Sequence, residues 1–306
     1  MFKNLIEATQ FFSDKQTCID YLAQLRWAGN TCCAHCGNGK VYELKGANKR
    51  YKCAECRKQF SVTKGLIFEN SPIPLQKWFV AIYLITSHKK GISSMQLSRD
   101  ISVTQKTAWF MLQRIRFALD TNSFELPVMD SVIECDETYI GGKSKNKHAN
   151  KRTKGAQGRS TKDKTPVFGL VERNGRVVAM KVPDTTRDTI HPIIEAHVGA
   201  GASVNTDEWM AYKGLDKRFS HSVVKHGEGI YVIGNVHTNT IEGFWSLLKR
   251  GIIGIYHQVS TKHLDKYIDE FEFRYNTKDN SEFERFNNML SLSAKRLTYG
   301  QLITNK

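Results

Sequence analysis

Three acidic side chains are candidates for chemistry, and they lie in three separate segments of the 306-residue chain. Asp136 belongs to a strand-like run, Asp207 follows an apolar lead-in at Val204, and Glu242 stands near the start of an amphipathic segment. Mg²⁺ prefers oxygen ligands and is held by few carboxylates together with substrate phosphates. A pair of such ions clamps the attacking and leaving oxygens of an in-line phosphoryl transfer. The pattern therefore predicts metal-dependent phosphoryl transfer.

The first acid has two rivals in its own segment. Glu134 shares a strand face with Asp136, and Glu137 lies on the opposite face. A carboxylate on a strand flanked by Ile133 and Ile140 is costly to bury unless it is paired or bound to a metal. The strand pattern therefore supplies a functional acid here without choosing among the three.

The other two acids also have structural interpretations. Asp207 is suited to cap a short helix over residues 208–212. Asn239 and Glu242 have the spacing of a capping box, in which the glutamate returns to the backbone of Asn239. Lys249 falls on the same helix face as Glu242 and, on this interpretation, is simply an exposed basic residue.

The text around the acids resembles insertion-sequence transposases of the DDE type, in the ISXO-type group with an N-terminal zinc ribbon and an RNase H-like, integrase-like catalytic domain. With the N-terminal region, the resemblance covers nearly the whole chain. The matching runs are Glu134-Cys-Asp136-Glu-Thr-Tyr-Ile-Gly-Gly-Lys143, Asn205-Thr-Asp207-Glu-Trp-Met-Ala-Tyr212, and His237-Thr-Asn-Thr-Ile-Glu242-Gly-Phe-Trp-Ser-Leu-Leu-Lys249-Arg-Gly.

The resemblance assigns roles to particular residues. It selects Asp136 from its neighbours and implies that Asp207 and Glu242 complete a catalytic, magnesium-binding set. It also implies that Lys249 contacts DNA near the cleavage point. Some members of the group carry an asparagine as the third residue, so Asn239, or its neighbour His237, stays open as a partner or replacement for Glu242.

The implied function is a DNA transposase that binds the terminal inverted repeats of an insertion sequence and catalyses metal-dependent cleavage and strand transfer. Asp136 is expected to bridge two Mg²⁺ (or Mn²⁺) ions, with Asp207 and Glu242 each holding one. A metal-activated water then attacks the phosphodiester, and the freed 3′-hydroxyl later attacks target DNA. Because two ends must be held together, we expect a homo-oligomer on DNA.

Two rival functions fit the same residues. A zinc-ribbon and helix-turn-helix regulator on a degenerate nuclease-like scaffold would bind DNA and leave it intact with Mg²⁺ or Mn²⁺. A nuclease without strand transfer would cut DNA but fail to integrate pre-cut ends.

The elements that must position the acids follow a recognisable order. Residues 131–140 read as a strand and 166–183 as a hairpin, because Asn174-Gly175 is a strong turn signal. A helix over 190–198, strands over 202–206 and 222–225, and helices over 240–250 and 263–275 follow. Strand, hairpin, helix, strand, helix is the order of an α/β, RNase H-like mixed sheet with flanking helices.

A basic segment separates the first strand from the hairpin. From Lys143 to Lys164, both included, there are nine Lys or Arg residues and one Asp, with almost no apolar residues. Such a segment cannot pack a core. Its place after Asp136 in the sequence suits a phosphate-backbone contact, to which we assign Lys143; a solvated loop is the alternative.

Two cysteine pairs predict a structural zinc site. Sixteen residues lie between the pair Cys33 and Cys36 and the pair Cys53 and Cys56, a spacing that suits four thiolates around Zn²⁺. Cys32 and His35 have the same spacing as the first pair. We prefer Cys33 and Cys36 because a glycine follows Cys36 and because the family's ribbon has this form. Strand-like runs on either side of residues 45–48 complete the predicted zinc ribbon.

A helix-turn-helix is predicted after the ribbon. The segment 94–100 and a helix beginning after the N-cap Thr104 are separated by a short turn. Buried positions are expected at Ala108, Met111, Leu112 and Ile115. Gln105 and Lys106, and also Trp109, would lie near DNA, whereas a plain helical bundle is the alternative.

Composition limits the classes of protein. There are 45 Lys and Arg residues against 30 Asp and Glu, a formal charge of +15, which favours a polyanionic partner such as DNA. No apolar run is long enough to span a bilayer and the N-terminus has no signal-peptide pattern. Because four of seven cysteines are in metal-type pairs, we expect a reducing, cytoplasmic location.

The expected domains follow from these segments. They are a helical lead-in over 1–29, a zinc ribbon over 30–70, a helix-turn-helix over 71–125, an RNase H-like catalytic domain over 126–290 and a tail over 291–306.

Overall fold

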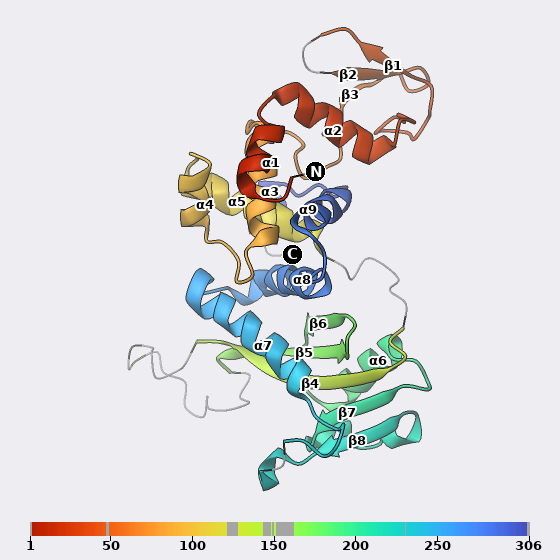
Figure 1. Cartoon of the computed structure of the whole chain (residues 1–306), viewed down its shortest axis with the longest axis vertical. Coiled ribbons are helices and arrows are strands. Elements are labelled where there is room, and N and C mark those ends of the chain that lie inside the picture. Colours follow the sequence, from red (N-terminus) through yellow and green to blue (C-terminus); the bar gives the residue numbers. More distant parts are fainter. Residues whose placement is uncertain are drawn as a thin grey trace. The chain divides into compact units, whose positions relative to one another are not determined.

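The computed structural model describes residues 2–46, 49–120, 128–142, 148, 150, 162–229 and 231–304. The chain forms two compact units (Figure 1). Unit 1 contains Met1–Asp120 and Asp279–Lys306, and unit 2 contains Thr121–Lys278. Each unit is described by itself.

A small antiparallel sheet next to a helix forms the N-terminal part of unit 1. Its strands are in the order β1-β2-β3, and α2 precedes them. Trp27, at the end of α2, packs edge-on against Tyr51 of β2 with the ring centroids 5.1 Å apart. The elements are α1 (Leu5–Phe11), α2 (Lys15–Trp27), β1 (Val41–Leu44), β2 (Arg50–Cys53) and β3 (Gln59–Ser61).

Three helices follow, and the last two form the predicted helix-turn-helix pair: α3 (Leu75–Ser87), α4 (Ser94–Asp100) and α5 (Gln105–Ala118). Thr104 caps α5, since its side chain accepts a hydrogen bond from the amide of Thr107. The predicted stripe is confirmed, because all four of its residues are buried: Ala108, Met111, Leu112 and Ile115.

The C-terminal helices belong to unit 1. They are α9 (Glu282–Ser291) and α10 (Tyr299–Ile303). Phe286 of α9 is buried, with its ring centroid 5.4 Å from that of Phe12 and 5.6 Å from that of Phe79. The sequence had suggested a catalytic domain to residue 290 and a tail over 291–306. Aromatic packing against the N-terminal helices instead groups residues 279–306 with unit 1.

Unit 2 contains a five-stranded mixed sheet in the order β6-β5-β4-β7-β8. β5 pairs antiparallel with both β4 and β6, whereas β7 is parallel to β4 and to β8. This arrangement confirms the predicted RNase H-like α/β fold. The strands are β4 (Val132–Gly141), β5 (Lys164–Glu172), β6 (Val177–Lys181), β7 (Ser203–Asp207) and β8 (Ser220–Val224).

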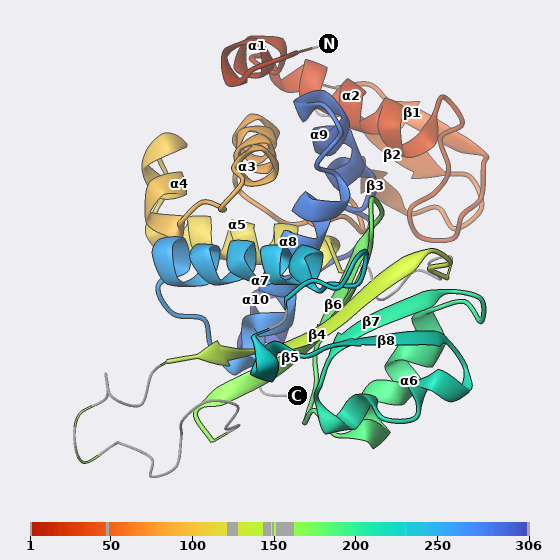
Figure 2. The ribbon, with the colours of Figure 1, turned by 60° about the horizontal axis from the view of Figure 1, so that its bottom comes forward.

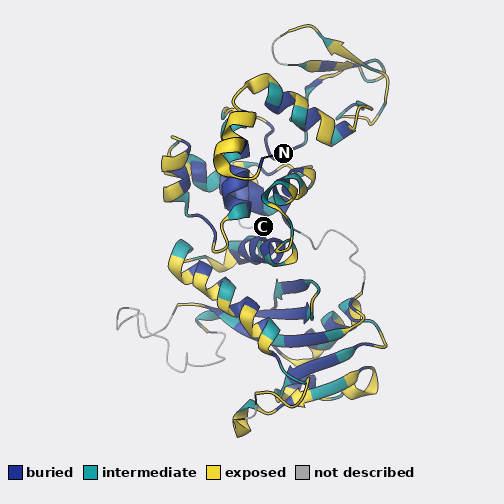
Figure 3. Ribbon diagram, in the orientation of Figure 1, coloured by how far each residue is buried: buried dark blue, intermediate teal, exposed yellow. Residues whose placement is uncertain are grey.

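Helices cover the two faces of this sheet (Figure 2). On one face, Ile190 and Ile194 of α6 (Arg187–His197) pack in a buried cluster with Ile133 and Cys135 of β4. On the other, α7 (Asn239–Gly251) and α8 (Leu264–Asn276) form a second cluster with β5 and β6. The central strands are largely buried (Figure 3). Alternating side chains of β4 therefore point into different layers.

Shorter helical turns complete unit 2: η3 (Met210–Tyr212), η4 (Leu215–Lys217), η5 (His226–Glu228), the π-helix η6 (Ile252–Tyr256) and η7 (Thr261–His263). Within the described ranges, no helix combines the length and apolar character needed to cross a bilayer.

Candidate functional site

Two of the predicted acids come from neighbouring strands. Asp136 lies in the middle of β4, and Asp207 ends the parallel strand β7. Carboxylate oxygens of Asp136, Glu137 and Asp207 all lie within 4.8 Å of one another. The parallel strands β4 and β7 pair with Glu134 opposite Asn205, so two residues farther along each strand Asp136 and Asp207 come side by side.

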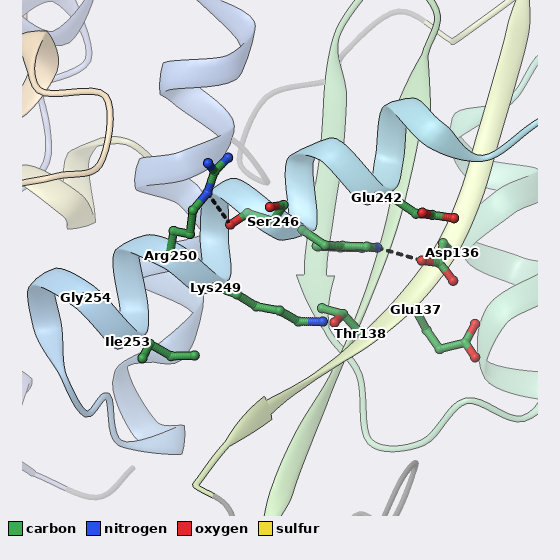
Figure 4. Close-up of a pocket in the computed structure, with 10 residues that line it drawn as sticks. Asp136, Glu137, Thr138, Glu242, Ser246, Lys249, Arg250, Ile253 and Gly254 are labelled. Atoms are coloured by element: carbon green, nitrogen blue, oxygen red, sulfur yellow. Dashed lines mark hydrogen bonds between the residues drawn. The ribbon is translucent and has the colours of Figure 1, made fainter.

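The third predicted acid faces the same space from α7. Asp136, Asp207 and Glu242 line one cavity of about 440 Å³, together with His226 and Thr238 among others. Asp136 and Glu242 also line a second cavity of about 600 Å³ that continues along α7. Figure 4 shows the Glu242 and Asp136 side chains on the same side of the helix–strand junction. The structure thus brings the three predicted acids to one cleft.

Glu242 does not form the capping box that its spacing allowed. Thr238, not Asn239, is the N-cap of α7, and no side-chain cap bond is made by Thr238 to a helix amide. The Thr238 hydroxyl instead donates to Oε1 of Glu242 at 3.0 Å. The Glu242 side chain is 47% exposed and lines the cavity.

Asp136 lies in an environment that disfavours its negative charge. Its Oδ2 accepts a hydrogen bond of 3.0 Å from the indole Nε1 of Trp245. Burial, followed by the nearby carboxylates of Glu137, Asp207 and Glu242, raises the pKa of Asp136 to about 8. Such crowding of negative charge is relieved by a bound cation.

Glu134, one rival of Asp136, has a different environment. Its side chain is fully buried, and its two oxygens accept hydrogen bonds from Arg173 and from the start of α7 at Thr240 and Ile241. All of these partners are protein groups. Glu134 therefore lies beneath the cleft as part of the protein's framework.

Glu137, the second rival, belongs to the acidic cluster although it points to the opposite face of β4 from Asp136. It is 7% exposed, and its Oε2 accepts a hydrogen bond of 2.8 Å from the buried hydroxyl of Tyr212. The carboxylate of Glu137 still reaches Asp207 because β7 ends there. The strand pattern did not choose between Glu137 and Asp136, the family resemblance selects Asp136, and the structure groups the two.

The remaining candidates for the third acid differ in position. Asn239 is exposed at the start of α7 and, among the described residues, is absent from the lining of both cavities. His237 lies over Glu134, with Nδ1 3.1 Å from Oε1. Neither side chain shares the position of Glu242.

His226 is a cleft residue that the sequence did not reveal. It lines the cavity of the acids, and its Nε2 lies 3.3 Å from the Thr238 hydroxyl and 3.9 Å from Oε1 of Glu242. A single histidine in a short turn has no periodic or spaced pattern. Its position in the site becomes visible only in the structure, where η5 places it next to Thr238 and Glu242.

Asp207 is not the N-cap of the short helix that follows, because η3 begins at Met210 with Trp209 as its N-cap. Oδ1 of Asp207 accepts a hydrogen bond of 2.9 Å from the amide of Trp209, which shapes the turn before η3. The same carboxylate contributes to the acidic cluster.

Lys249 extends the cleft with positive charge. It lines the second cavity with Asp136, Glu242 and Arg250 (Figure 4). Burial lowers the pKa of Lys249, the nearby Asp136 opposes this shift, and Lys164 adds to it. A cation beside an acidic centre is suited to hold a phosphate of a bound strand.

A second possible metal centre lies in the small sheet of unit 1. Sγ atoms of Cys33 and Cys56 are 3.6 Å apart, and those of Cys36 and Cys53 are 3.7 Å apart. A tetrahedral zinc ion with bonds of about 2.3 Å holds its sulfurs about 3.8 Å apart, so the four thiols fit zinc. Cys32 lies outside this cluster.

Two thiols of the zinc cluster differ in pKa: the amide of Asn38 acts to lower that of Cys36, but desolvation and hydrogen bonds with the neighbouring thiols raise it to about 12. Burial acts to raise the pKa of Cys33, but hydrogen bonds from the amides of His35 and Cys36 and from neighbouring thiols lower it to about 7. The amide of His35 lies 3.3 Å from the Cys33 sulfur. His35 therefore contributes its backbone here, while its ring lies near the carbonyl of Gln59.

The predicted DNA-contacting residues of the helix-turn-helix are exposed at the start of α5. Gln105 donates a hydrogen bond to the hydroxyl of Ser94, and the ammonium of Lys106 lies 5.3 Å from the ring centroid of Tyr299. Trp109 is half-buried. Lys143 lies outside the described residues.

Both centres, the acidic cleft and the cysteine cluster, lie in segments of the chain that match known protein families. Residues 128–276 match the family described as the ISXO2-like transposase domain, and residues 13–59 match the transposase zinc-ribbon domain. A Halobacterium salinarum protein, described as an uncharacterized protein in transposable element ISH50, is 32% identical over 274 residues. That match covers 86% of this chain and 91% of the relative.

Two solved structures give weaker similarities. A simian T-cell lymphotropic virus intasome in complex with a PP2A regulatory subunit has a TM-score of 0.25 at 14% identity, covering 72% of this chain and 69% of that one. A pre-cleavage Mos1 transpososome has a TM-score of 0.24 at 13% identity, covering 68% and 76%. The fold assignment accordingly depends on strand order, and the family on the sequence matches. By those matches, the chain belongs to the ISXO2-like transposase family with a transposase zinc ribbon.

Proposed function

We propose that this transposase-family protein is a catalytically competent DDE enzyme that cuts the ends of an insertion sequence and joins them to target DNA. The observation that carries this proposal is the convergence of Asp136, Asp207 and Glu242 on one cavity. In this proposal Asp136, Asp207 and Glu242 would hold the metal ions, and Asp136, which lines both cavities, would serve as a ligand shared by the ions. Asn239 is assigned no direct role in the reaction.

The acidic cluster fits divalent cations. Neighbouring oxygens around one Mg²⁺ are about 3 to 4 Å apart, given metal–oxygen distances near 2.1 Å. Oxygens of Asp136, Glu137 and Asp207 within 4.8 Å of one another need only small adjustments to meet this spacing. We assign Mg²⁺ or Mn²⁺ to Asp136 and Asp207 of this cluster and to Glu242, which lines the same cavity but is not part of the close cluster. The ions would activate the attacking oxygen and neutralise charge on the scissile phosphate.

The protein's own residues prepare the site. Trp245 donates a hydrogen bond to one oxygen of Asp136, and Asp136 lines both cavities. Thr238 holds Glu242 toward the same cavity. Lys249 and Arg250 line the continuation of the cleft, where their charges would bind the backbone of the DNA strand.

DNA recognition is assigned to unit 1. Gln105 and Lys106 stand exposed at the start of α5, as the second helix of a helix-turn-helix requires for major-groove contact. The zinc ribbon would extend the interface to the terminal inverted repeats. Because each end needs its own binding and catalytic units, the active assembly is proposed to be a homo-oligomer on DNA.

The test is incubation of the protein with DNA carrying the element's own ends, with Mg²⁺, followed by integration of pre-cut ends into a plasmid. The expected result is cleavage and integration by wild type. Asp136→Asn is expected to retain end binding and lose nicking. Undiminished nicking by that variant contradicts the assignment, intact DNA supports a regulator, and cleavage without integration supports a nuclease.

A further inference from the structure

We infer that Glu134 and Arg173 are a positioning pair that sets where Glu242 stands relative to Asp136. The inference rests on the proposed function, because it assigns Glu242 to the metal site. Neither residue lines the cavities of the acids among the described residues. Their action is therefore through the backbone that carries Glu242.

Glu134 caps α7 from a neighbouring strand. Its Oε2 accepts hydrogen bonds from the amides of Thr240 at 2.7 Å and Ile241 at 3.1 Å, and its Oε1 accepts one from the Thr240 hydroxyl at 2.9 Å. The first amides of a helix have no partner within the helix. A carboxylate at this end is also favoured by the helix dipole.

Arg173 connects the same carboxylate to the loop before the helix. Its Nε donates to Oε1 of Glu134 at 2.7 Å, while its Nη1 and Nη2 donate to the carbonyl oxygens of Asn235 and His237. Asn205 of β7 directs its Nδ2 to the His237 carbonyl at 3.5 Å. The loop that delivers Thr238 is thus fixed to the sheet on which Asp136 and Asp207 stand.

Two residues of β4 attach α7 to the sheet at two points along the helix. Glu134 and Asp136 are two residues apart on the same strand face, and each holds α7 at a different point. Glu134 binds the first turn, and Asp136 accepts the Trp245 indole about one turn farther on. Glu242 lies between these two attachments. Loss of the Glu134 contacts would therefore let the first turn of α7, which carries Glu242, move, while the Trp245–Asp136 hydrogen bond remains.

Glu134 and Arg173 are also more buried than Glu242, the proposed metal ligand on α7. The Glu134 side chain is 0% exposed and that of Arg173 is 18% exposed. A buried carboxylate needs partners for its charge, and here a guanidinium and helix amides supply them. Orienting groups behind a metal ligand typically change metal affinity or activity by about 10- to 100-fold when they are lost.

The experiment compares Glu134→Ala and Glu134→Gln with Glu172→Ala in the full-length protein. Glu172 is a matched control, because its Oε1 accepts three hydrogen bonds from Asp130 and Ser131 at the start of β4, away from α7. Two readouts are independent of turnover: amide hydrogen exchange of residues 237–243, and Mn²⁺ affinity measured by titration. The third is the Mg²⁺ concentration for half-maximal cleavage.

Glu134→Ala is expected to accelerate exchange over 237–243 and weaken Mn²⁺ binding by about 10- to 100-fold, with DNA-end binding unchanged. Glu134→Gln keeps an oxygen for the helix amides, so intermediate values are expected even if the alanine variant folds poorly. Glu172→Ala is expected to accelerate exchange near residue 131 and leave Mn²⁺ binding at the wild-type value.

Wild-type Mn²⁺ affinity and exchange in both Glu134 variants would overturn the positioning role. Equal loss of Mn²⁺ affinity in Glu172→Ala would also overturn it, since general destabilisation would then explain the effect. A wild-type protein that binds Mn²⁺ but cleaves no DNA overturns the proposed function alone, because exchange and affinity still report on the pair.

Discussion

The indole of Trp245 donates its hydrogen bond to Asp136 across the junction of α7 and β4, at 3.0 Å. Space for that indole comes from Gly169, which is the register partner of Asp136 on β5. A Cβ atom at Gly169 would lie 2.6 Å from Cη2 of Trp245. Trp245 of α7, Asp136 of β4 and Gly169 of β5 thus depend on one another for their packing.

Trp245→Phe should lower metal-dependent cleavage by about 10- to 100-fold, because Asp136 loses the donor that orients it. Most of the apolar packing of α7 is retained by phenylalanine. Single-turnover cleavage and end-binding titrations would measure the effect, and binding should stay at the wild-type level. Full cleavage by the phenylalanine variant would show that the indole hydrogen bond is dispensable.

Gly169→Ala should displace Trp245 and with it α7, because the added methyl group overlaps the indole. Overpacking of this kind costs about 1–3 kcal/mol, so urea unfolding of the variant should begin at lower concentration. Cleavage should fall as well. Gly201→Ala is the control, since a Cβ there meets nothing within 4 Å. Equal stability of the two variants would contradict the close packing described for Trp245.

The zinc cluster gives a prediction for unit 1. Cys36→Ser should lower the bound zinc measured by mass spectrometry and abolish end binding, because a ribbon this small depends on the metal for its fold. Cys32→Ser should retain zinc at the wild-type level, since Cys32 lies outside the cluster. Zinc loss in Cys32→Ser with retention in Cys36→Ser would reverse the ligand assignment.

Lys106→Gln should weaken end binding to specific and nonspecific DNA alike if the Lys106 ammonium contacts a backbone phosphate when α5 lies in the major groove. The slope of log affinity against log salt should fall by about 1 in magnitude, the value for one lost phosphate contact. Lys3→Gln removes an exposed lysine outside the helix-turn-helix and should leave the slope at its wild-type value. An unchanged slope in Lys106→Gln removes this residue from the interface.

Much of the fold could be predicted from local pattern. The alternation around Asp136, the Asn174-Gly175 turn and the paired cysteines are short-range signals, and the corresponding strands, hairpin and cluster are present. The positions of Asp136, Asp207 and Glu242 on two strands and a helix followed from these elements. Choosing Asp136 over its neighbours required the family resemblance.

The rest depends on contacts between distant residues. A capping box at Asn239 and Glu242 was a sound local expectation, but Glu134, 106 positions before Thr240, supplies the cap instead. The grouping of α9 with unit 1 likewise arises from the packing of Phe286 on Phe12, which no local pattern encodes. Such long-range partners decide which of several local possibilities is realised.

The most direct test of the account is diffraction from crystals of the protein with end DNA and Mn²⁺, recorded for the anomalous signal of manganese. We predict manganese peaks bounded by the carboxylates of Asp136, Asp207 and Glu242, beside the scissile phosphate. Manganese bound only by Asp136, Glu137 and Asp207 would remove Glu242 from the metal site. Manganese peaks elsewhere, with these carboxylates free of metal, would contradict the central claim.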